Sequence, residues 1–285
     1  ALCTTNLPTP TITDGSTAFD VVLYSSDGNA RTISGLNMSP DLVWSKRRSS
    51  AGRNVLTDSV RGVNKELFPN RTDAERTSTN GLTAFNSDGY TLGTDSGQYG
   101  WQANGQTFVN WAWDAGSSTV SNTDGDMTST VRVNQSAGFS IVKWTSPSGT
   151  TPFDVGHGLN TAPSFIITKC MTNASGWYCY HEALDATNPQ NKYLQLNTTQ
   201  GALTSADSWG TSKPNSTTFG DRHLNWAGGD DIIAYCFSPV DNYSAFGSYI
   251  GNGNTSNGPF INTGFRPALV IFKRIETSAT ASWYI

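Results

Sequence analysis

Histidines are the residues that most often act as acids or bases near neutral pH, and this sequence has three of them: His157, His181 and His223. His157 stands between two glycines and three residues after Asp154, so a nearby serine would complete the residue set of a hydrolytic triad. The sequence has no Gly-x-Ser-x-Gly nucleophile elbow, and serine is abundant enough that chance pairings are expected. We therefore expect His157 to be a structural turn residue.

Carboxylates are the second group to consider, because glycosidases use two of them across a cleft. The glutamates are scattered along the chain, and most aspartates stand in turn-like sequences, including the pair Asp230 and Asp231. The stretch from Asn122 through Asp124 to Asp126 resembles part of a calcium loop but lacks the glutamate that closes one. The sequence thus predicts no catalytic residue, no metal site and no cofactor, and the protein is not expected to be an enzyme.

The four cysteines are too few for a disulfide scaffold and do not have zinc-site spacing. If the turn is Asn173-Ala-Ser-Gly176, then Cys170 and Cys179 stand directly opposite each other on a hairpin. A directly opposed pair of the closely spaced kind can form a disulfide. Two reduced, packed thiols are the alternative.

Tryptophan is the most promising residue type for ligand binding, with nine in the chain. Four of them fall near expected turns or strand ends: Trp101, Trp177, Trp209 and Trp226. Because an exposed indole ring can stack on a sugar face, these four are candidate glycan contacts. The alternative is a place in the core, which is usual for tryptophan in small β-units.

The composition indicates the elements that must position these residues. Only 14% of the residues are charged and 11% are aromatic, with many Ser, Thr, Asn and Gly residues, which favours strands joined by polar turns. The net charge is −4, and no basic stripe is present, so we expect no nucleic-acid partner. No stretch approaches the ~20 apolar residues that span a bilayer, so we expect no membrane insertion.

An internal repeat organises the chain. Gly35-Leu-Asn-Met-Ser-Pro40 recurs as Gly158-Leu-Asn-Thr-Ala-Pro163, and each motif is followed by an apolar strand that ends in lysine, at Lys46 and Lys169. The offset is constant, since 163 − 40 and 169 − 46 both equal 123. A third copy begins near Tyr243 and runs to the returning strand of a hairpin, and either more polypeptide or another chain would complete it.

These observations predict an all-β fold of tandem antiparallel β-sandwich units, jelly-roll-like in character, because no crossover helices lie between the strands. The expected divisions are an extended N-terminal linker at 1–16, a first unit at 17–115, a flexible linker at 116–135, a second unit at 136–240 and an incomplete third unit at 241–285.

Several phrases resemble a known class of phage proteins, among them Ser39-Pro-Asp-Leu-Val-Trp-Ser-Lys46, Trp111-Ala-Trp-Asp-Ala-Gly116 and Thr263-Gly-Phe-Arg-Pro267. The chain is similar to the repeated domain of unknown function in tail fibre and other virion proteins of marine and cyanobacterial tailed phages, often found after a concanavalin-like or SPRY-like domain. The resemblance implies a location on the virion and contacts with other virion proteins. No catalytic residue is carried over.

The expected function is therefore that of a virion structural protein, a tail fibre or surface-projecting appendage that adheres to host surface glycans through many weak contacts. A homo-oligomer is expected, with a trimer favoured, because fibre proteins are commonly trimers. The alternatives are a capsid decoration or knob protein, and a polysaccharide-binding or polysaccharide-degrading module.

Overall fold

The computed structural model describes residues 10–94, 100–149, 151–221, 226–276 and 280–285. Nearly all of its regular structure is antiparallel β-sheet, which confirms the predicted all-β sandwich class. Three short 3₁₀ turns are the only helical elements within those ranges: η2 (Gly15–Thr17), η3 (Glu182–Leu184) and η4 (Pro189–Asn191). The predicted linker at 1–16 lies largely outside the described residues, and its last residues enter η2, which Asp14 caps.

The first half of the chain forms a four-stranded sheet. Its order is β1 (Phe19–Ser25), β9 (Thr107–Trp113), β3 (Leu42–Arg47) and β4 (Asn54–Asp58). The last strand of this sheet along the chain is β9, and we call the strand in this position the closing strand of its half. It is central, because it pairs with β1 on one side and β3 on the other.

The second half forms a larger sheet of eight strands. Its middle is the set β12 (Phe139–Thr145), β19 (Asp231–Phe237), β14 (Phe165–Cys170) and β15 (Trp177–His181). Strands β10 (Thr119–Asn122) and β11 (Ser129–Asn134) extend one edge, and β16 (Lys192–Gln195) and β17 (Leu203–Thr204) extend the other.

The two sheets share strand order and register. Trp113 of β9 stands opposite both Phe19 and Leu42, and Phe237 of β19 stands opposite both Phe139 and Phe165. The strands that follow Pro40 and Pro163 therefore have the same position in their sheets. The exact unit boundaries at 17–115 and 136–240 stay predictions.

Each sheet has an outer face covered by a smaller one. Strands β2 (Arg31–Ser34), β8 (Gly89–Leu92) and β7 (Leu82–Asn86) cover the first, with β5 (Lys65–Glu66) and β6 (Arg76–Thr77) at its end. Strands β13 (Phe153–Gly156) and β18 (Thr218–Asp221) cover the second. Each covered face holds its own buried apolar cluster.

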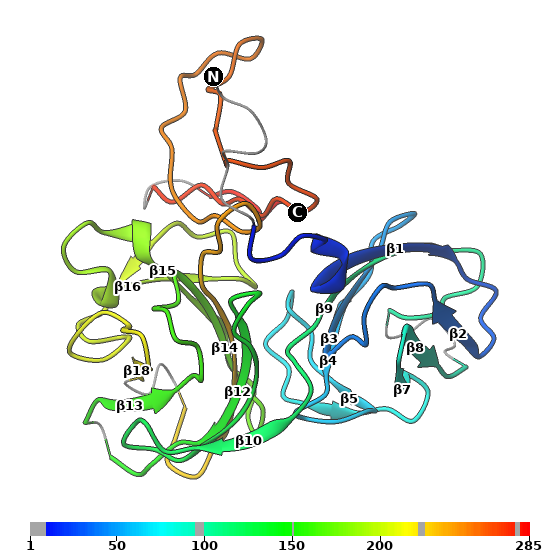
Figure 1. Cartoon of the computed structure of the whole chain (residues 1–285), viewed down its shortest axis with the longest axis horizontal. Helices are drawn as coiled ribbons and strands as arrows, with labels where there is room; N and C mark the ends of the chain where they lie inside the picture. The colour runs from blue at the N-terminus through cyan, green and yellow to red at the C-terminus, as the bar shows by residue number, and fades with distance from the viewer. Residues whose placement is uncertain (1–9, 95–99, 150, 222–225, 277–279) are drawn as a thin grey trace.

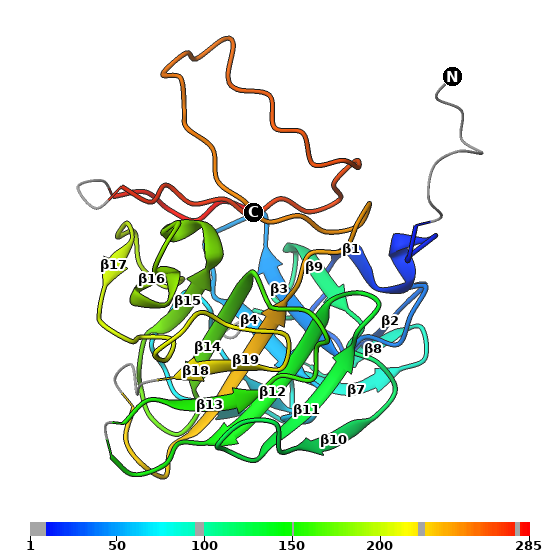
Figure 2. The same cartoon turned by 60° about the vertical axis from the view of Figure 1, so that its left-hand side comes forward.

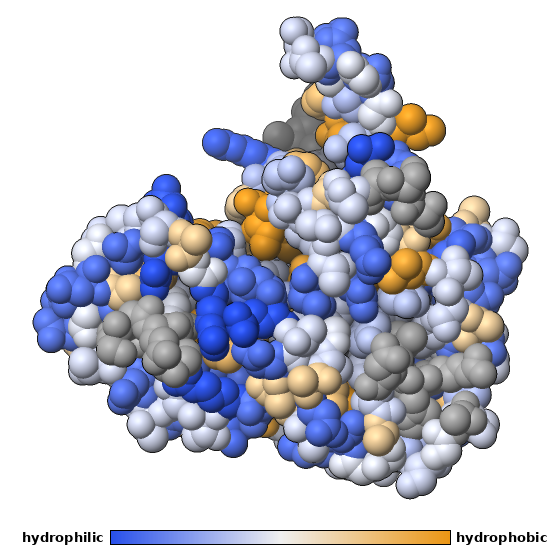
Figure 3. All heavy atoms as spheres, turned by 180° about the vertical axis from the view of Figure 1, so that it is seen from behind, coloured by the Kyte–Doolittle hydropathy of each residue, from blue (hydrophilic) through white to orange (hydrophobic). Residues whose placement is uncertain are grey.

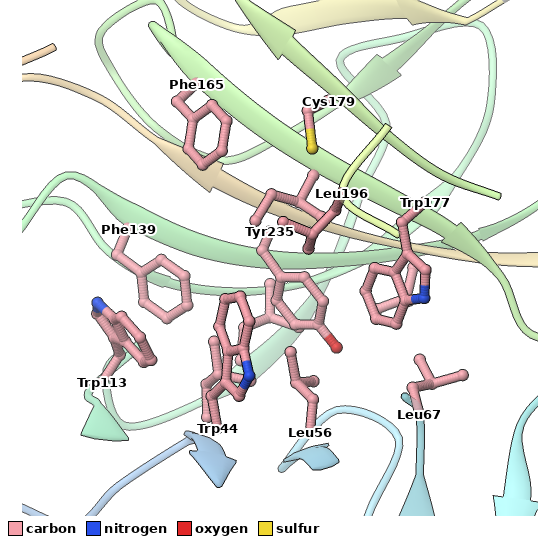
Figure 4. Close-up of a cluster of buried hydrophobic side chains, with 14 of the residues drawn as sticks. Trp44, Leu56, Leu67, Trp113, Phe139, Phe165, Trp177, Cys179, Leu196 and Tyr235 are labelled. Carbon is pink, nitrogen blue, oxygen red and sulfur yellow. The ribbon is translucent and has the colours of Figure 1, made fainter. Parts of the chain in front are cut away.

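The inner faces of the two sheets pack against each other and form a central core. Trp44 and Leu56 of the first sheet lie across from Phe139, Phe165 and Tyr235 of the second (Figure 4). The two halves of the chain lie side by side (Figure 1), and the contact between them is hydrophobic.

The segment 116–135 is not the flexible linker that its composition predicted. It forms β10 and β11, which pair with each other, and β11 also pairs with β12 at the front of the view in Figure 2. Val131 stands opposite Val142 and is fully buried, so tertiary pairing outweighs the polar composition.

The C-terminal segment, residues 241–285, has little regular structure where it is described. It forms the upper loops of Figure 1 and contains two isolated bridges, Val240 with Ser244 at its start and Phe272 with Tyr284 near its end. Eight of the eleven large exposed apolar side chains of the described residues lie in this segment, including Ile250 and Phe260. Orange hydrophobic surface is visible on this projection and where it meets the body (Figure 3).

Candidate functional site

A buried ionic cluster joins the two sheets across the central core. The Tyr235 hydroxyl donates to Asp58 at 2.7 Å, and the Arg61 guanidinium pairs with Asp58 and, at 3.2 Å, with Glu75. Asp58 also accepts backbone N–H bonds from Val60 and Arg61. Because every charge has a partner, this cluster serves to fix the relative position of the sheets.

Two members of this cluster, Arg61 and Tyr235, keep their protonation states near neutral pH. Burial lowers the pKa of Arg61, but the charges of Asp58 and its neighbours outweigh that effect and raise the pKa above its ordinary value. Burial, followed by the charge of Asp58, raises the pKa of Tyr235 well above 10. Arg61 therefore stays charged and Tyr235 neutral, which suits a structural role and not proton transfer.

A hairpin of the second sheet docks on a loop of the first. The β14–β15 hairpin contacts residues 68–75, which we name the first acceptor segment. Trp177 donates its indole N–H to the Phe68 carbonyl at 3.0 Å, and the Lys169 ammonium donates to the Thr72 carbonyl at 3.2 Å. Two backbone bonds of 2.9 Å complete the contact, from Ser175 to Thr72 and from Glu75 to Met171.

The C-terminal hairpin, segments 268–276 and 280–285, docks on residues 195–202 of the second half, which we name the second acceptor segment. Trp283 donates its indole N–H to the Gln195 carbonyl at 3.0 Å, and Lys273 donates to the Thr199 carbonyl at 2.9 Å. The backbone bonds run from Ala281 to Thr199 and from Ala202 to Ile275, both at 2.9 Å.

The two docking contacts are the same contact at two places in the chain. The bonding residues of the two acceptor segments differ by a constant offset, because 195 − 68, 199 − 72 and 202 − 75 all equal 127. The two tryptophans and the two lysines also have matching roles, and each lysine further donates to a carbonyl of its own hairpin, Ser175 or Ala281. One geometry thus joins the first half to the second and the second half to the C-terminal hairpin.

The four candidate glycan-contact tryptophans lie inside the protein, which is the core placement that the sequence left open as the alternative. Trp101 and Trp177 are 0% exposed, Trp209 is 1% and Trp226 is 7%. Trp101 donates to Glu66, Trp177 to the Phe68 carbonyl and Trp209 to the Lys192 carbonyl. Rings covered in this way cannot stack on a sugar, and they lie in three separate apolar clusters and not at one site.

The predicted opposition of Cys170 and Cys179 is wrong. Cys179 stands opposite Ile167, because the turn after β14 is longer than the sequence suggested. Cys170 is three residues from Ile167, so its side chain lies on the other face of the sheet. It packs in the outer cluster, whereas Cys179 packs in the central core, and both are free thiols. Cys3 lies outside the described residues.

His157 contacts backbone groups through both ring nitrogens, as a structural turn residue would. It is fully buried, its Nδ1 accepts the backbone N–H of Leu159, and its Nε2 lies 3.1 Å from the Asn215 carbonyl oxygen. Burial lowers its pKa to about 4, so it is neutral at pH 7. His223 lies outside the described residues.

The aspartates of the calcium-like stretch accept hydrogen bonds from the protein itself. Asn122 and Asp124 bond each other, and Asp126 accepts the backbone N–H of Asp154. Where the structure describes the chain, no group of three or more His, Cys, Asp and Glu residues has an arrangement that could hold a metal ion. Across the same parts of the chain, no helix combines the length and the hydropathy that a membrane crossing requires.

The docking contact is the site that the sequence reasoning missed. Its signal was present in the lysine that ends each repeated strand and in the tryptophans at 177 and 283. Their partners are backbone carbonyls, which carry no residue-type signal, so the contact becomes visible only in three dimensions.

Comparison with known proteins supplies a family and no chemistry. A family described as a domain of unknown function, DUF7483, matches residues 14–285, which include both sheets and both docking hairpins. No curated protein and no solved structure matches the chain. The chain therefore belongs to the DUF7483 family of domains of unknown function.

Proposed function

We propose that this chain is a non-enzymatic structural protein of a bacteriophage particle, a tail fibre or another projecting appendage that attaches the particle to its host. The setting comes from the resemblance of its repeated phrases to those of tail fibre and virion proteins. Other virion proteins are its proposed partners, and its proposed location is the particle surface.

The observation that carries this proposal is the docking contact that occurs twice. Its lysine, tryptophan and backbone bonds join consecutive parts of the chain in one direction, from residues 68–75 to the β14–β15 hairpin and from residues 195–202 to the C-terminal hairpin. A directional contact between like units lets a protein lengthen by adding units, which is how repeat proteins build extended bodies.

The character of the interior also favours a structural role. The central core is apolar, and the cluster of Asp58, Arg61 and Glu75 beside it is internally paired. Catalytic carboxylates and bases are usually found with shifted pKa values in a cleft, whereas His157 is shifted because it is buried in a turn. These features favour an assembly protein over an enzyme.

The proposed mode of attachment is multivalent binding to host surface glycans. Weak sites on several linked units reach high avidity, because the second contact forms at a raised effective concentration. A trimer is the proposed assembly and would multiply these contacts further. Since the four buried tryptophans are not available, such sites would use exposed polar turn residues.

Labelling of phage particles tests the location. An antibody against the purified chain, applied to particles of the phage that encodes it, should mark the tail fibres or another appendage in electron micrographs. Label on the capsid would support the decoration or knob alternative. Absence of the chain from purified particles by mass spectrometry would contradict the proposal.

Binding and hydrolysis assays test the activity. The purified chain should bind host cells, lose binding when surface polysaccharide is stripped and release no reducing sugar from that polysaccharide. Reducing sugar that appears with time would establish the polysaccharide-degrading alternative. Equal binding to stripped and intact cells would contradict glycan attachment.

A further inference from the structure

The C-terminal segment has the plan of the first part of a unit. Phe19, Pro40 and Lys46 recur as Phe246, Pro267 and Lys273, and 246 − 19, 267 − 40 and 273 − 46 all equal 227. The bridge between Phe272 and Tyr284 takes the place of the β3–β4 pairing and of the β14–β15 pairing. The segment therefore corresponds to residues 19–55 of the first half.

Three exposed apolar side chains of this segment occupy positions that are buried in the first half. Phe260 corresponds to Ile33 at the same offset of 227; Phe260 is 91% exposed and Ile33 is 7% exposed. Val270 corresponds in the same way to Val43, with exposures of 54% and 0%. Tyr284 pairs with Phe272 in the same way as Val55 pairs with Ser45 and Tyr178 pairs with Thr168. The Tyr284 side chain is 52% exposed.

The structure also indicates what covers these positions in a complete unit. Ile33, Val43 and Val55 lie in one cluster with residues that come later in the chain than β4, among them Phe68, Leu82, Tyr90, Leu92, Trp101 and Ala112. In the second half, the corresponding residues include Trp209, Phe219, Ile232 and Ala234. The covering residues thus come from the part of a unit that follows its returning strand.

The closing strand is the most important part of that cover. β9 lies between β1 and β3, and β19 lies between β12 and β14, so each closing strand supplies hydrogen bonds to both neighbours. Among the described residues of 246–285, no strand lies between the segment that begins at Phe246 and the segment that ends at Lys273. Both segments consequently present unpaired backbone groups and apolar side chains.

We infer that the C-terminal segment is an acceptor surface for the second part of a like unit, a polypeptide of the type of residues 182–237 whose closing strand is apolar on both faces, as β19 is. In β19, Ile232 and Ala234 lie in the outer cluster, and Ile233 and Tyr235 lie in the central core. A strand with that pattern would pair between the two segments and cover Phe260 and Val270. This inference does not depend on a location on a virion.

A chimaera of the full chain tests the inference. A second copy of residues 182–237 is appended after Ile285, and cleavage by chymotrypsin at Phe260 and Tyr249 is measured. Pairing should slow cleavage at both sites by about tenfold or more, because stable burial limits cleavage to rare local opening. Hydrogen exchange at Val270 and Tyr284 should slow as well.

The matched control is the same chimaera with the substitutions I232D and I233D in the appended copy alone, which place a charge on each face of the closing strand. This control should be cleaved as fast as the unmodified chain. Slow exchange of the β12 and β19 amides in every protein verifies that the body is folded.

Two results would overturn the inference. The first is equal cleavage of the chimaera and its control. The second is protection of Phe260 in the unmodified chain that increases with protein concentration, because a second whole copy would then be the occupant.

Discussion

Tyr235 of β19 donates a hydrogen bond of 2.7 Å to Asp58 of β4, a residue 177 positions earlier in the chain. The bond crosses the central core, where the inner faces of the two sheets meet. The bond joins β19 of the second sheet to the Asp58–Arg61 ion pair at the end of β4 in the first sheet. It therefore links the two halves of the chain.

The Asp58 carboxylate is expected to be the largest single polar contribution to stability. The substitution Asp58→Ala would remove the closest partner of the buried Arg61, whose other partners where the chain is described are Glu75 and the Leu56 carbonyl. We expect a loss of about 3–5 kcal/mol in the free energy of unfolding, measured by urea titration. Asp27→Ala is the control, because its pair with Arg31 is exposed to solvent and its removal should change the free energy of unfolding little. Equal losses in the two variants would contradict this role.

The indole N–H of Trp177 is expected to stabilise the first docking contact beyond the packing of its ring. Trp177→Phe should lose about 1–2 kcal/mol more than Trp44→Phe, because the carbonyl of Phe68 would lose a buried hydrogen bond. Trp44 is a matched control, since it is buried in the same core and its Nε1 has no hydrogen-bond partner among the described residues. Identical losses would show that the bond contributes nothing.

The thiols of Cys170, Cys179 and Cys236 are expected to be free and protected. Burial raises the pKa of Cys179 and of Cys236, which leaves little reactive thiolate at neutral pH. Iodoacetamide should modify all three only after unfolding, as read by mass spectrometry, and a reductant should not change the melting temperature. A Cys170–Cys179 disulfide in the native protein would contradict the observed register.

Stability is expected to fall in mild acid because of His157. Its pKa is about 4 in the fold and about 6.5 when exposed, so the unfolded chain binds a proton that the folded chain does not. Its contribution is complete above pH 6.5 and is lost as pH falls to 4, by about 3 kcal/mol in total.

The free energy of unfolding should therefore depend less on pH between 6.5 and 4 in His157→Gln than in the unmodified protein. Some dependence should remain, because burial also lowers the pKa of His181. The same pH dependence in both proteins would show that His157 is not the titrating group.

Local pattern was sufficient to predict the strands that follow the repeated motifs. The motifs that end at Pro40 and Pro163 predicted an apolar strand after each of them, and β3 and β14 stand at those places. These features depend on backbone preference and on one buried face, which short stretches of sequence express.

Features set by tertiary contact were predicted less well. The strands at 116–135 form because Val131 meets Val142, and composition alone does not express that pairing. The burial of Trp101 and Trp209 depends on the small outer sheets, and the separation of Cys170 from Cys179 depends on the length of one turn. The docking contact uses backbone carbonyls and left only the recurrent lysine and tryptophan as a trace.

Hydrogen exchange at the Ser175 and Ala281 amides tests most directly whether one docking geometry occurs twice. Each amide donates to a threonine carbonyl, of Thr72 or Thr199, at 2.9 Å. Both amides should exchange at least about tenfold more slowly than that of Ile250, whose side chain is 92% exposed. Protection of Ser175 together with exchange of Ala281 as fast as that of Ile250 would contradict the second docking contact.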